Sequence, residues 1–225
     1  MKKKSLGFKL VVGGILVVLI PLLIVGVFSA VRSAKALSDA AKDQALNVAR
    51  DLAGMVQIVL AEEIKLISEL SVRDDIIGVA SKVAKESSEA AESDLNTVGN
   101  NLAAMMKKIG KDYEAAILID TNGVVIADGI GGKSKGISLA DRDYFKDVKA
   151  GKAYAIGTAV KSKLSGNPTV TIASPLLSSS GEFVGAVAMV MKTDFISEKL
   201  TSIKIGKTGY AHMTDKTGLV IAHPK

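Results

Sequence analysis

An uncharged apolar segment near the amino terminus constrains this chain more than any other feature. No residue from Leu10 to Val31 is charged, and about 20 apolar residues are enough to cross the hydrocarbon core of a bilayer as one helix. Four lysines lie within residues 1–9, and the positive-inside rule keeps such a basic end in the cytoplasm. We therefore predict a helix across the cell inner membrane over residues 10–31, followed by a periplasmic or extracellular region.

A cleaved signal peptide is the alternative interpretation of this segment. Basic residues, an apolar run and the small residues Ser29 and Ala30 also fit that description. The run is longer than the usual signal-peptide core of about 7 to 15 residues, which favours the retained helix. Both interpretations place the rest of the chain outside the cytoplasm.

Composition argues against several classes of function. The chain has no cysteine and only two histidines, His212 and His223, which rules out disulfides and thiolate metal sites. Aromatic residues make up only 4% of the chain and tryptophan is absent, whereas nucleic-acid binders that use stacking interleave basic and aromatic residues. There is no phosphate-binding loop and no dinucleotide fingerprint. We expect no metal, no cofactor, no nucleic-acid partner and no enzymatic activity.

A helical stripe follows the apolar segment. Its apolar residues are spaced mostly by alternating fours and threes, which places them on one side of a helix, and Glu62 interrupts the pattern. We predict a long helix over residues 32–75. Its stripe is either the seam of a homodimer, as in a coiled coil, or a packing face within one subunit. The stripe consists of Ala41, Ala45, Val48, Leu52, Met55, Val59 and Leu66.

Short β-branched runs separated by turn residues begin after Gly110 and indicate an antiparallel sheet. Asn122-Gly123 suits a hairpin turn between the first two runs. Two helical stretches, one from Ile76 and one ending near Lys108, precede the sheet, and residues 138–150 resemble a short helix. The predicted fold class is α+β, with five strands over residues 115–120, 124–128, 153–160, 169–177 and 183–191.

One segment of the predicted sheet recurs. Residues 119–128 and 214–223 share an acidic residue, a glycine and an apolar run in the same order, 95 residues apart. This pattern predicts a strand, a tight turn and a partner strand in each copy. A second sheet module is therefore expected to start near residue 205. Because only its start is present, we expect residues from Gly206 onward to be poorly ordered unless another chain completes the sheet.

Taken together, these features resemble the double Cache sensor domains of bacterial chemoreceptors and sensor kinases. The residues that carry the resemblance are Ile117 to Asp128, Ser138 to Phe145, Asn167 to Leu176 and Gly185 to Val187. The resemblance implies two PAS-like modules stacked along a long helix, of which the membrane-distal module binds the ligand. The expected organisation is a basic end, a membrane helix, a signalling helix, a distal module and a truncated proximal module, over residues 1–9, 10–31, 32–75, 76–204 and 205–225.

The resemblance also suggests ligand-binding residues. Amino-acid-binding members of the family use an Arg-x-aromatic-aromatic motif to grip the ligand carboxylate, and Arg142, Tyr144 and Phe145 match its spacing. A guanidinium offers planar paired donors that suit a carboxylate. The acidic residues that hold the ammonium group in those members correspond to Ser162 and Val190 here. A small carboxylate without an amine is therefore the expected ligand, and we place Asp141 and Ser162 in the site.

Strand alternation adds two residues to the expected site. In the predicted strand 153–160, Tyr154, Ile156, Thr158 and Val160 share one face. Tyr154 and Thr158 would be the hydrogen-bonding members of a pocket on that face. Alternatively, the face is ordinary core.

The motif residues also have structural alternatives. In this alternative, Arg142 forms a structural ion pair with Asp141 or Asp143, and the rings of Tyr144 and Phe145 are only packed in the core.

The function expected from these features is ligand sensing by a transmembrane chemoreceptor, with a cytoplasmic output module that this sequence does not contain. A histidine kinase or a cyclic-dinucleotide enzyme can carry the same kind of sensor. A membrane-anchored structural or assembly protein is the remaining alternative, and it predicts self-association without a small-molecule pocket.

Overall fold

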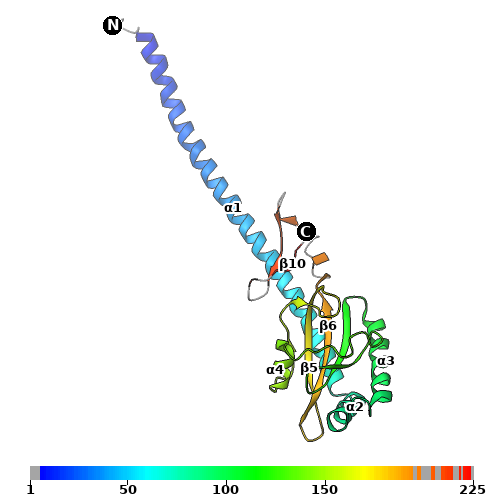
Figure 1. Ribbon diagram of the computed structural model, residues 1–225. Helices are drawn as coiled ribbons and strands as arrows, with labels where there is room; N and C mark the ends of the chain where they lie inside the picture. The colour runs from blue at the N-terminus through cyan, green and yellow to red at the C-terminus, as the bar shows by residue number, and fades with distance from the viewer. Residues whose placement is uncertain are drawn as a thin grey trace. The chain divides into compact units, whose positions relative to one another are not determined.

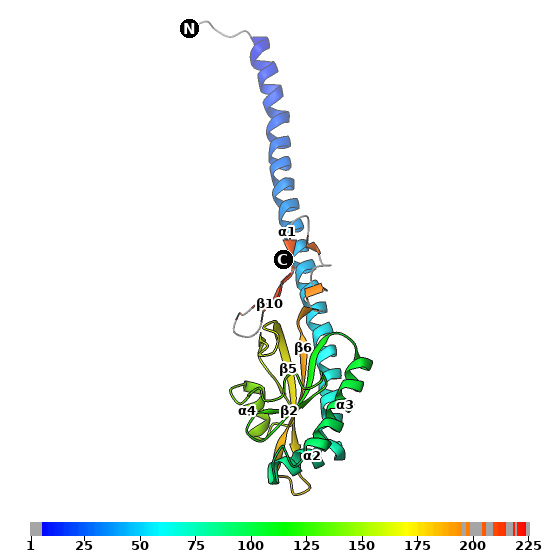
Figure 2. The ribbon, with the colours of Figure 1, turned by 45° about the vertical axis from the view of Figure 1, so that its right-hand side comes forward.

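The computed structural model describes residues 6–194, 197–198, 204–205, 209–214, 218 and 220–223. The chain divides into two units, residues 1–54 and residues 55–225, and each is described by itself. Helix α1, Leu6–Ser71, contributes residues to both units. Figures 1 and 2 show the ribbon in two orientations.

In the first unit, residues 6–54 are helical throughout, and residues 6–44 are all exposed. The apolar side chains between Leu10 and Val31 therefore face outward on every side. A helix that is apolar all round is stable only where lipid or protein covers it. Within the described part of the chain, α1 is the one helix long and apolar enough to cross a membrane. Pro21 lies inside α1, a position that membrane helices tolerate.

The second unit is built on an antiparallel sheet. The sheet order is β2-β1-β6-β5-β3, and β4 also pairs with β5. The central strands are the long ones, β5 and β6, which pair along almost their whole length. The strands are β1 Tyr113–Ile119, β2 Val125–Asp128, β3 Ala155–Ile156, β4 Val160–Lys161, β5 Pro168–Leu177 and β6 Phe183–Lys192.

Three helices pack on one face of this sheet. The end of α1 contributes the buried residues Ile67 and Leu70, and α2, Asp74–Lys85, and α3, Glu92–Ile109, complete the layer. The larger side chains of the central strands, among them Ile172 and Met189, point into this layer. Figures 1 and 2 show α2 and α3 on the side of the sheet away from α4.

The opposite face of the sheet carries smaller side chains. Ala115, Ala173, Ala186 and Ala188 are buried there, beneath helix α4, Asp143–Lys149. Alanines leave room between the sheet and its cover, so this face is where a cavity can form. One face of the sheet is therefore covered by tightly packed helices, and the opposite face has space for a cavity.

Several predicted elements are confirmed, with small shifts at their ends. The long helix ends at Ser71, and four of the five predicted strands match β1, β2, β5 and β6 within about two residues. The predicted helix 138–150 is shorter, because Arg142 is extended and Leu139 N donates to Gly123 O over 2.6 Å.

The predicted continuous strand 153–160 is wrong. It is divided into β3 and β4, with Gly157, Thr158 and Ala159 between them outside any strand. Thr158 N donates to Asp143 Oδ2 over 2.9 Å instead of to a neighbouring strand. A hydrogen bond to a side chain of α4 therefore replaces the strand-to-strand backbone hydrogen bond at this point.

The repeated hairpin forms in both copies. In the first, Ile119 lies opposite Val125 and Leu118 opposite Ala127. In the second, β9, Met213–Thr214, pairs with β10, Val220–Ala222, so that Thr214 lies opposite Val220 and Met213 opposite Ala222. These are the same pairs moved by 95 residues, so the two copies share one register.

Two more short strands, β7 Lys204–Ile205 and β8 Gly209–Tyr210, pair before the second hairpin. Part of the segment on which poor order was expected from Gly206 onward, including 206–208 and 215–217, lies outside the described residues.

Candidate functional site

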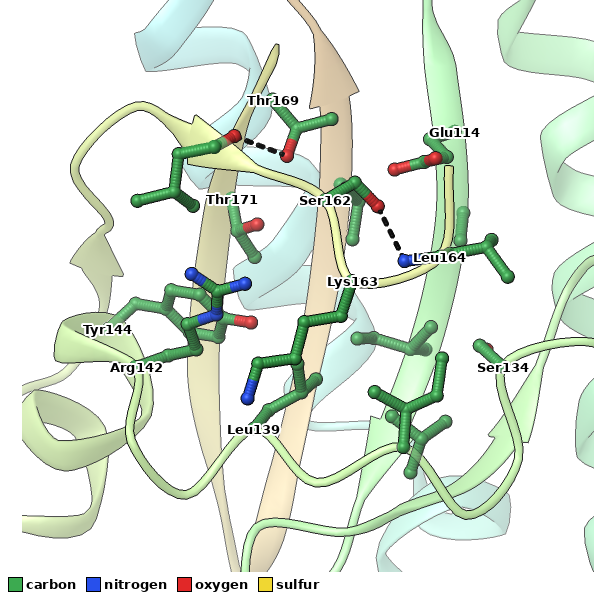
Figure 3. Close-up of a pocket in the computed structure, with 16 residues that line it drawn as sticks. Glu114, Ser134, Leu139, Arg142, Tyr144, Ser162, Lys163, Leu164, Thr169 and Thr171 are labelled. Carbon is green, nitrogen blue, oxygen red and sulfur yellow. Dashed lines mark hydrogen bonds between the residues drawn. The ribbon is translucent and has the colours of Figure 1, made fainter. Parts of the chain in front are cut away.

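A cavity lies on the alanine-rich face of the sheet, under α4 and the loops that flank it (Figure 3). Its free volume is about 40 Å³, and about 450 Å³ when the adjoining open solvent is included. β1, β5 and β6 form its floor, and the segments around Leu139 and Ser162 form its walls. We call it the sheet cavity.

Arg142 enters the sheet cavity from the start of α4. One terminal nitrogen of its guanidinium donates to Lys161 O over 3.1 Å. A guanidinium carries five N–H groups, so this bond orients the side chain without exhausting its donors. The alternative pairing of Arg142 with Asp141 or Asp143 is not what the structure shows. Asp141 pairs with Lys163, and Asp143 accepts bonds from backbone N–H groups.

Tyr144 lines the cavity and is only 3% exposed. Burial raises the pKa of its phenol to about 12, and the charge of Arg142 and a hydrogen bond with Thr171 act in the opposite direction. The phenol therefore stays protonated at neutral pH. Gly157 makes room for the ring, because a Cβ at position 157 would lie 2.7 Å from Tyr144 Cδ1.

Three of the residues expected in the site lie elsewhere. Phe145 is buried in the core, where it makes an edge contact with Phe183 at 6.2 Å between ring centroids. Tyr154 is 44% exposed and does not line the sheet cavity. Thr158 lines a different hollow, beside Ile156. The face on which Tyr154, Ile156 and Thr158 were grouped does not exist, because the strand is interrupted.

Asp141 also lies outside the lining, but it holds one wall in place. Its Oδ1 accepts a bond from Lys163 Nζ over 2.7 Å, and the same ammonium donates to Ser138 O over 2.9 Å. Lys163 belongs to the turn of residues 161–167, which contributes Ser162, Lys163 and Leu164 to the lining of the cavity (Figure 3). We call this turn the cover turn. Lys163 thus ties it to the loop that leads into α4.

Ser162 lines the cavity and also shapes the cover turn. Its Oγ accepts bonds from Leu164 N over 3.1 Å and from Ser165 N over 3.3 Å. Its hydroxyl can still donate, since a serine hydroxyl has one O–H group and two lone pairs.

Five polar residues of the cavity were not expected from the sequence, and three of them, Thr169, Thr171 and Glu114, belong to the sheet that forms its floor. Thr169 and Thr171 alternate on the cavity face of β5, where Thr169 Oγ1 donates to Val160 O over 3.4 Å. The sequence did contain a signal for these two residues, because threonines two positions apart in an apolar strand lie on the same face of the sheet. Glu114 gave no such signal, since it precedes the expected start of its strand. Both of its carboxylate oxygens are buried, and neither has a hydrogen-bond partner among the described residues.

A loop after β2 closes another side of the cavity. Asp128 accepts bonds from Ile130 N, Gly132 N, Ser134 N and Ser134 Oγ, over 2.6 to 3.0 Å. Burial acts to raise the pKa of Asp128, but these hydrogen bonds together hold it below its usual value. Ser134, which lines the cavity, is thereby fixed in place.

Ser134 also stands at the centre of Gly132-Lys133-Ser134-Lys135-Gly136, the spacing of a hydrolase nucleophile. In hydrolases that serine lies at a sharp turn from a strand into a helix. Here it lies in the loop after β2 and donates to Asp128 Oδ2 over 2.6 Å. The hydroxyl has a structural partner in this loop.

A family model described as a Cache domain matches residues 33–225. The chain belongs to the Cache domain family. The resemblance to double Cache sensors seen in the sequence is therefore confirmed. Over 225 residues this Cache chain is 27% identical to methyl-accepting chemotaxis protein McpB of Bacillus subtilis (strain 168). The match covers 99% of this chain and 32% of that protein, so the chain spans about a third of the relative's length.

Two solved structures with a similar fold are sensor domains of other proteins. The sensor domain of the V. cholerae histidine kinase DctB matches with a TM-score of 0.56 at 17% identity, over 65% of this chain and 54% of that one. The ligand-binding domain of the Pseudomonas fluorescens chemoreceptor CtaA, in complex with L-serine, matches with a TM-score of 0.53 at 20% identity. That match covers 77% of this chain and 67% of that one. At these identities the similarity shows the Cache fold alone.

Proposed function

We propose that this chain is the membrane-anchored sensor region of a chemoreceptor and that the sheet cavity binds a small carboxylate. The observation that carries the proposal is Arg142, whose guanidinium lines a cavity that also contains the hydroxyl groups of Thr169 and Thr171. A carboxylate accepts paired N–H bonds from a guanidinium, and these charged bonds are about twice as strong as neutral ones. The apolar walls strengthen them further by excluding water.

The size of the cavity supports a small ligand. One water molecule needs about 10 to 15 Å³ of such free volume, so 40 Å³ corresponds to a molecule of only a few non-hydrogen atoms. A larger ligand requires the cover turn to move. We therefore expect two- to three-carbon carboxylates to be favoured over long ones.

The family and the chemotaxis relative support a role in signalling. Ligand on one face of the sheet would bias the packing of α1 on the other, where Ile67 and Leu70 are buried. A ligand can shift such an equilibrium only as far as its affinities for the two states differ. Residues 10–31 would anchor the receptor in the inner membrane, with the sensor on the periplasmic side. On this proposal the chain is a binding module without catalytic activity.

A sensor region of a histidine kinase is the second candidate, and the similarity to the DctB sensor domain favours it. The two candidates share the same cavity and differ in the module that follows the sensor. An assembly protein without a ligand is the third candidate. It predicts self-association through the α1 stripe and no binding in the sheet cavity.

The test is isothermal titration of the whole chain in detergent micelles with acetate, propionate, pyruvate, amino acids and amines. We expect carboxylates to bind and Arg142→Ala to abolish that binding. Lys146→Ala is the matched control, because it removes one exposed positive charge from α4 outside the cavity. If no carboxylate binds, or if both variants bind like the parent, the proposal is wrong.

A further inference from the structure

Tyr113 connects the sheet to the long helix α1. Its hydroxyl donates to Glu63 Oε1, and Glu63 is only 7% exposed. The other oxygen of Glu63 is buried and has no hydrogen-bond partner among the described residues. Loss of the bond from Tyr113 would therefore leave a buried carboxyl group without any partner, which is unfavourable. The packing of α1 on the sheet is thus sensitive to the position of Tyr113.

The next residue, Glu114, lines the sheet cavity on the opposite face of the sheet. The pairing between β1 and β6 shifts register between Tyr113 and Ala115, so Glu114 is the extra residue of a β-bulge. Glu114 and Ala115 both line the cavity, whereas Tyr113 packs against the helical face. Because the extra residue of a bulge is unpaired, Glu114 can shift without first breaking the strand pairing of its neighbours.

Glu114 is also the polar lining residue that is held least firmly. Both of its carboxylate oxygens are buried without a hydrogen-bond partner among the described residues. Arg142, Ser162 and Thr169 each make a hydrogen bond at the cavity. The free volume is about 40 Å³, so a ligand that fills it lies against the lining side chains. The side chain that such a ligand displaces most readily is that of Glu114.

We propose that the bulge at Tyr113 and Glu114 transmits occupancy of the sheet cavity to α1. A ligand in the cavity displaces Glu114, and this displacement turns the peptide unit that joins Glu114 to Tyr113. The hydrogen bond from Tyr113 to Glu63 then weakens, and α1 shifts on the helical face of the sheet. The inference rests on the proposed function and names the residues through which a ligand on one face acts on the other.

The first test uses the reciprocity of coupled equilibria. Neither Tyr113 nor Glu63 lines the cavity. Tyr113→Phe should nevertheless tighten propionate binding by about fivefold or more, because the ligand no longer has to weaken the bond to Glu63. A purely structural role of Tyr113 predicts lower stability without tighter binding. Titration calorimetry on the whole chain in detergent micelles gives the affinities, and urea unfolding gives the stabilities.

Two further variants make this test specific. Tyr113→Phe combined with Glu63→Leu leaves no buried carboxyl group at the contact, so it should fold well and bind propionate as tightly as Tyr113→Phe. Ser68→Ala is the matched control, because its hydroxyl group donates to Ile64 O within α1. Ser68→Ala should bind propionate like the parent. Unchanged or weaker binding by both Tyr113 variants would overturn the coupling and leave the carboxylate proposal standing.

The shift of α1 can be measured directly with spin labels. The chain has no cysteine, so labels can be attached to cysteines placed at the exposed positions Lys65 on α1 and Glu182 before β6. Propionate should change the distance between the labels in the parent and not in Tyr113→Phe. The same change in both proteins would overturn the role of Tyr113.

A variant without ligand separates this inference from the proposed function. Thr171→Leu lengthens a side chain of the cavity floor and takes up part of the free volume. It should change the label distance when Tyr113 is present and not in combination with Tyr113→Phe. If no carboxylate binds but this change is seen, the proposed function is wrong and the coupling stands. If Thr171→Leu leaves the label distance unchanged, the coupling is wrong.

Discussion

At the residue scale, the sheet cavity depends on small residues that leave space for larger ones. Gly157 lies against the Tyr144 ring. The sheet surface facing α4 carries short side chains, namely those of Ala115, Ala173, Ala186 and Ala188. The guanidinium of Arg142 is oriented by its hydrogen bond to Lys161 O. Binding should therefore be sensitive to changes that add even one methyl group near Tyr144.

Gly157→Ala is predicted to weaken both folding and binding. Its Cβ would lie 2.7 Å from Tyr144 Cδ1, closer than packed atoms approach, and the buried ring has little room to move. Overpacking of this kind costs about 1 to 3 kcal/mol. Gly78→Ala in α2 is the control, because nothing lies within 4 Å of the added Cβ. Urea unfolding and ligand titration measure the two effects, and a variant as stable as the parent would contradict this packing argument.

Glu63 is predicted to make folding depend on pH. It is 7% exposed on α1, and burial raises its pKa above the ordinary value of 4.5, opposed by a hydrogen bond from Tyr113. The folded state therefore holds this proton more tightly than the unfolded state does. The contribution to stability is greatest below pH 4.5 and is lost as the pH rises through the higher, folded pKa.

Comparison with Glu63→Gln isolates this effect. The free energy of unfolding of the parent, minus that of the variant, should fall as the pH is raised from about 4.5. Taking the difference removes the opposite trends of Asp128 and Asp143, whose pKa values are lowered. Urea titrations at several pH values provide the measurement. A difference that stays constant or grows with pH would exclude the proposed protonation.

At the element scale, the cover turn forms one wall of the sheet cavity. It is tied to the loop before α4 by Lys163 and by the bond from Arg142 to Lys161 O. The side chains of Lys163 and Asp141 are 36% and 63% exposed. An exposed ion pair contributes no more than about 1 kcal/mol and is screened by salt. The contact is therefore suited to opening and closing rather than to stability.

Asp141→Asn is predicted to speed both ligand association and dissociation while changing the melting temperature little. The turn would open more often, and the cavity lining would stay the same. Stopped-flow measurements should show both rates rising, and added salt should shift the parent in the same direction. Asp147→Asn, which breaks the exposed pair with Lys152, is the control. If Asp141→Asn changed equilibrium affinity as strongly as Arg142→Ala, Asp141 would belong to the binding site itself.

At the scale of the whole molecule, the exposed apolar surface of α1 requires a cover. The chain has no cysteine, so single cysteines can report on the partner of α1 directly. Val48→Cys lies on the apolar stripe, and Asn47→Cys lies off it as the control. If α1 forms a homodimer seam in membranes, Val48→Cys should form disulfide-linked dimers and Asn47→Cys should not. Equal cross-linking of the two, or none, would contradict the seam.

Retention of residues 10–31 as a membrane anchor is also testable. The chain expressed in bacteria should resist extraction from membranes by alkaline carbonate and should keep its full mass. Loss of about 30 residues, with cleavage near Ala30, would support the signal-peptide interpretation instead. Mass spectrometry of the purified chain distinguishes the two outcomes.

The sequence alone determined the features that depend on neighbouring residues. Hydropathy over Leu10 to Val31 indicated a helix long and apolar enough to cross a membrane, and turn chemistry at Asn122-Gly123 indicated the hairpin that recurs at β9 and β10. Arg142 and Tyr144 were expected in the site from the resemblance to a motif of the Cache family, and both line the cavity. These signals are local because helix burial in lipid and tight turns depend on the residues within them.

Only the tertiary structure decided the features that depend on contacts between distant segments. The strand expected over residues 153–160 is interrupted because Asp143 accepts the bond from Thr158 N, which strand alternation cannot anticipate. Asp141 is placed outside the lining by its pairing with Lys163. Glu114 reaches the cavity through a bulge defined by pairing with β6. Register and bulges arise when strands meet, so no period within β1 alone could place this carboxylate opposite Arg142.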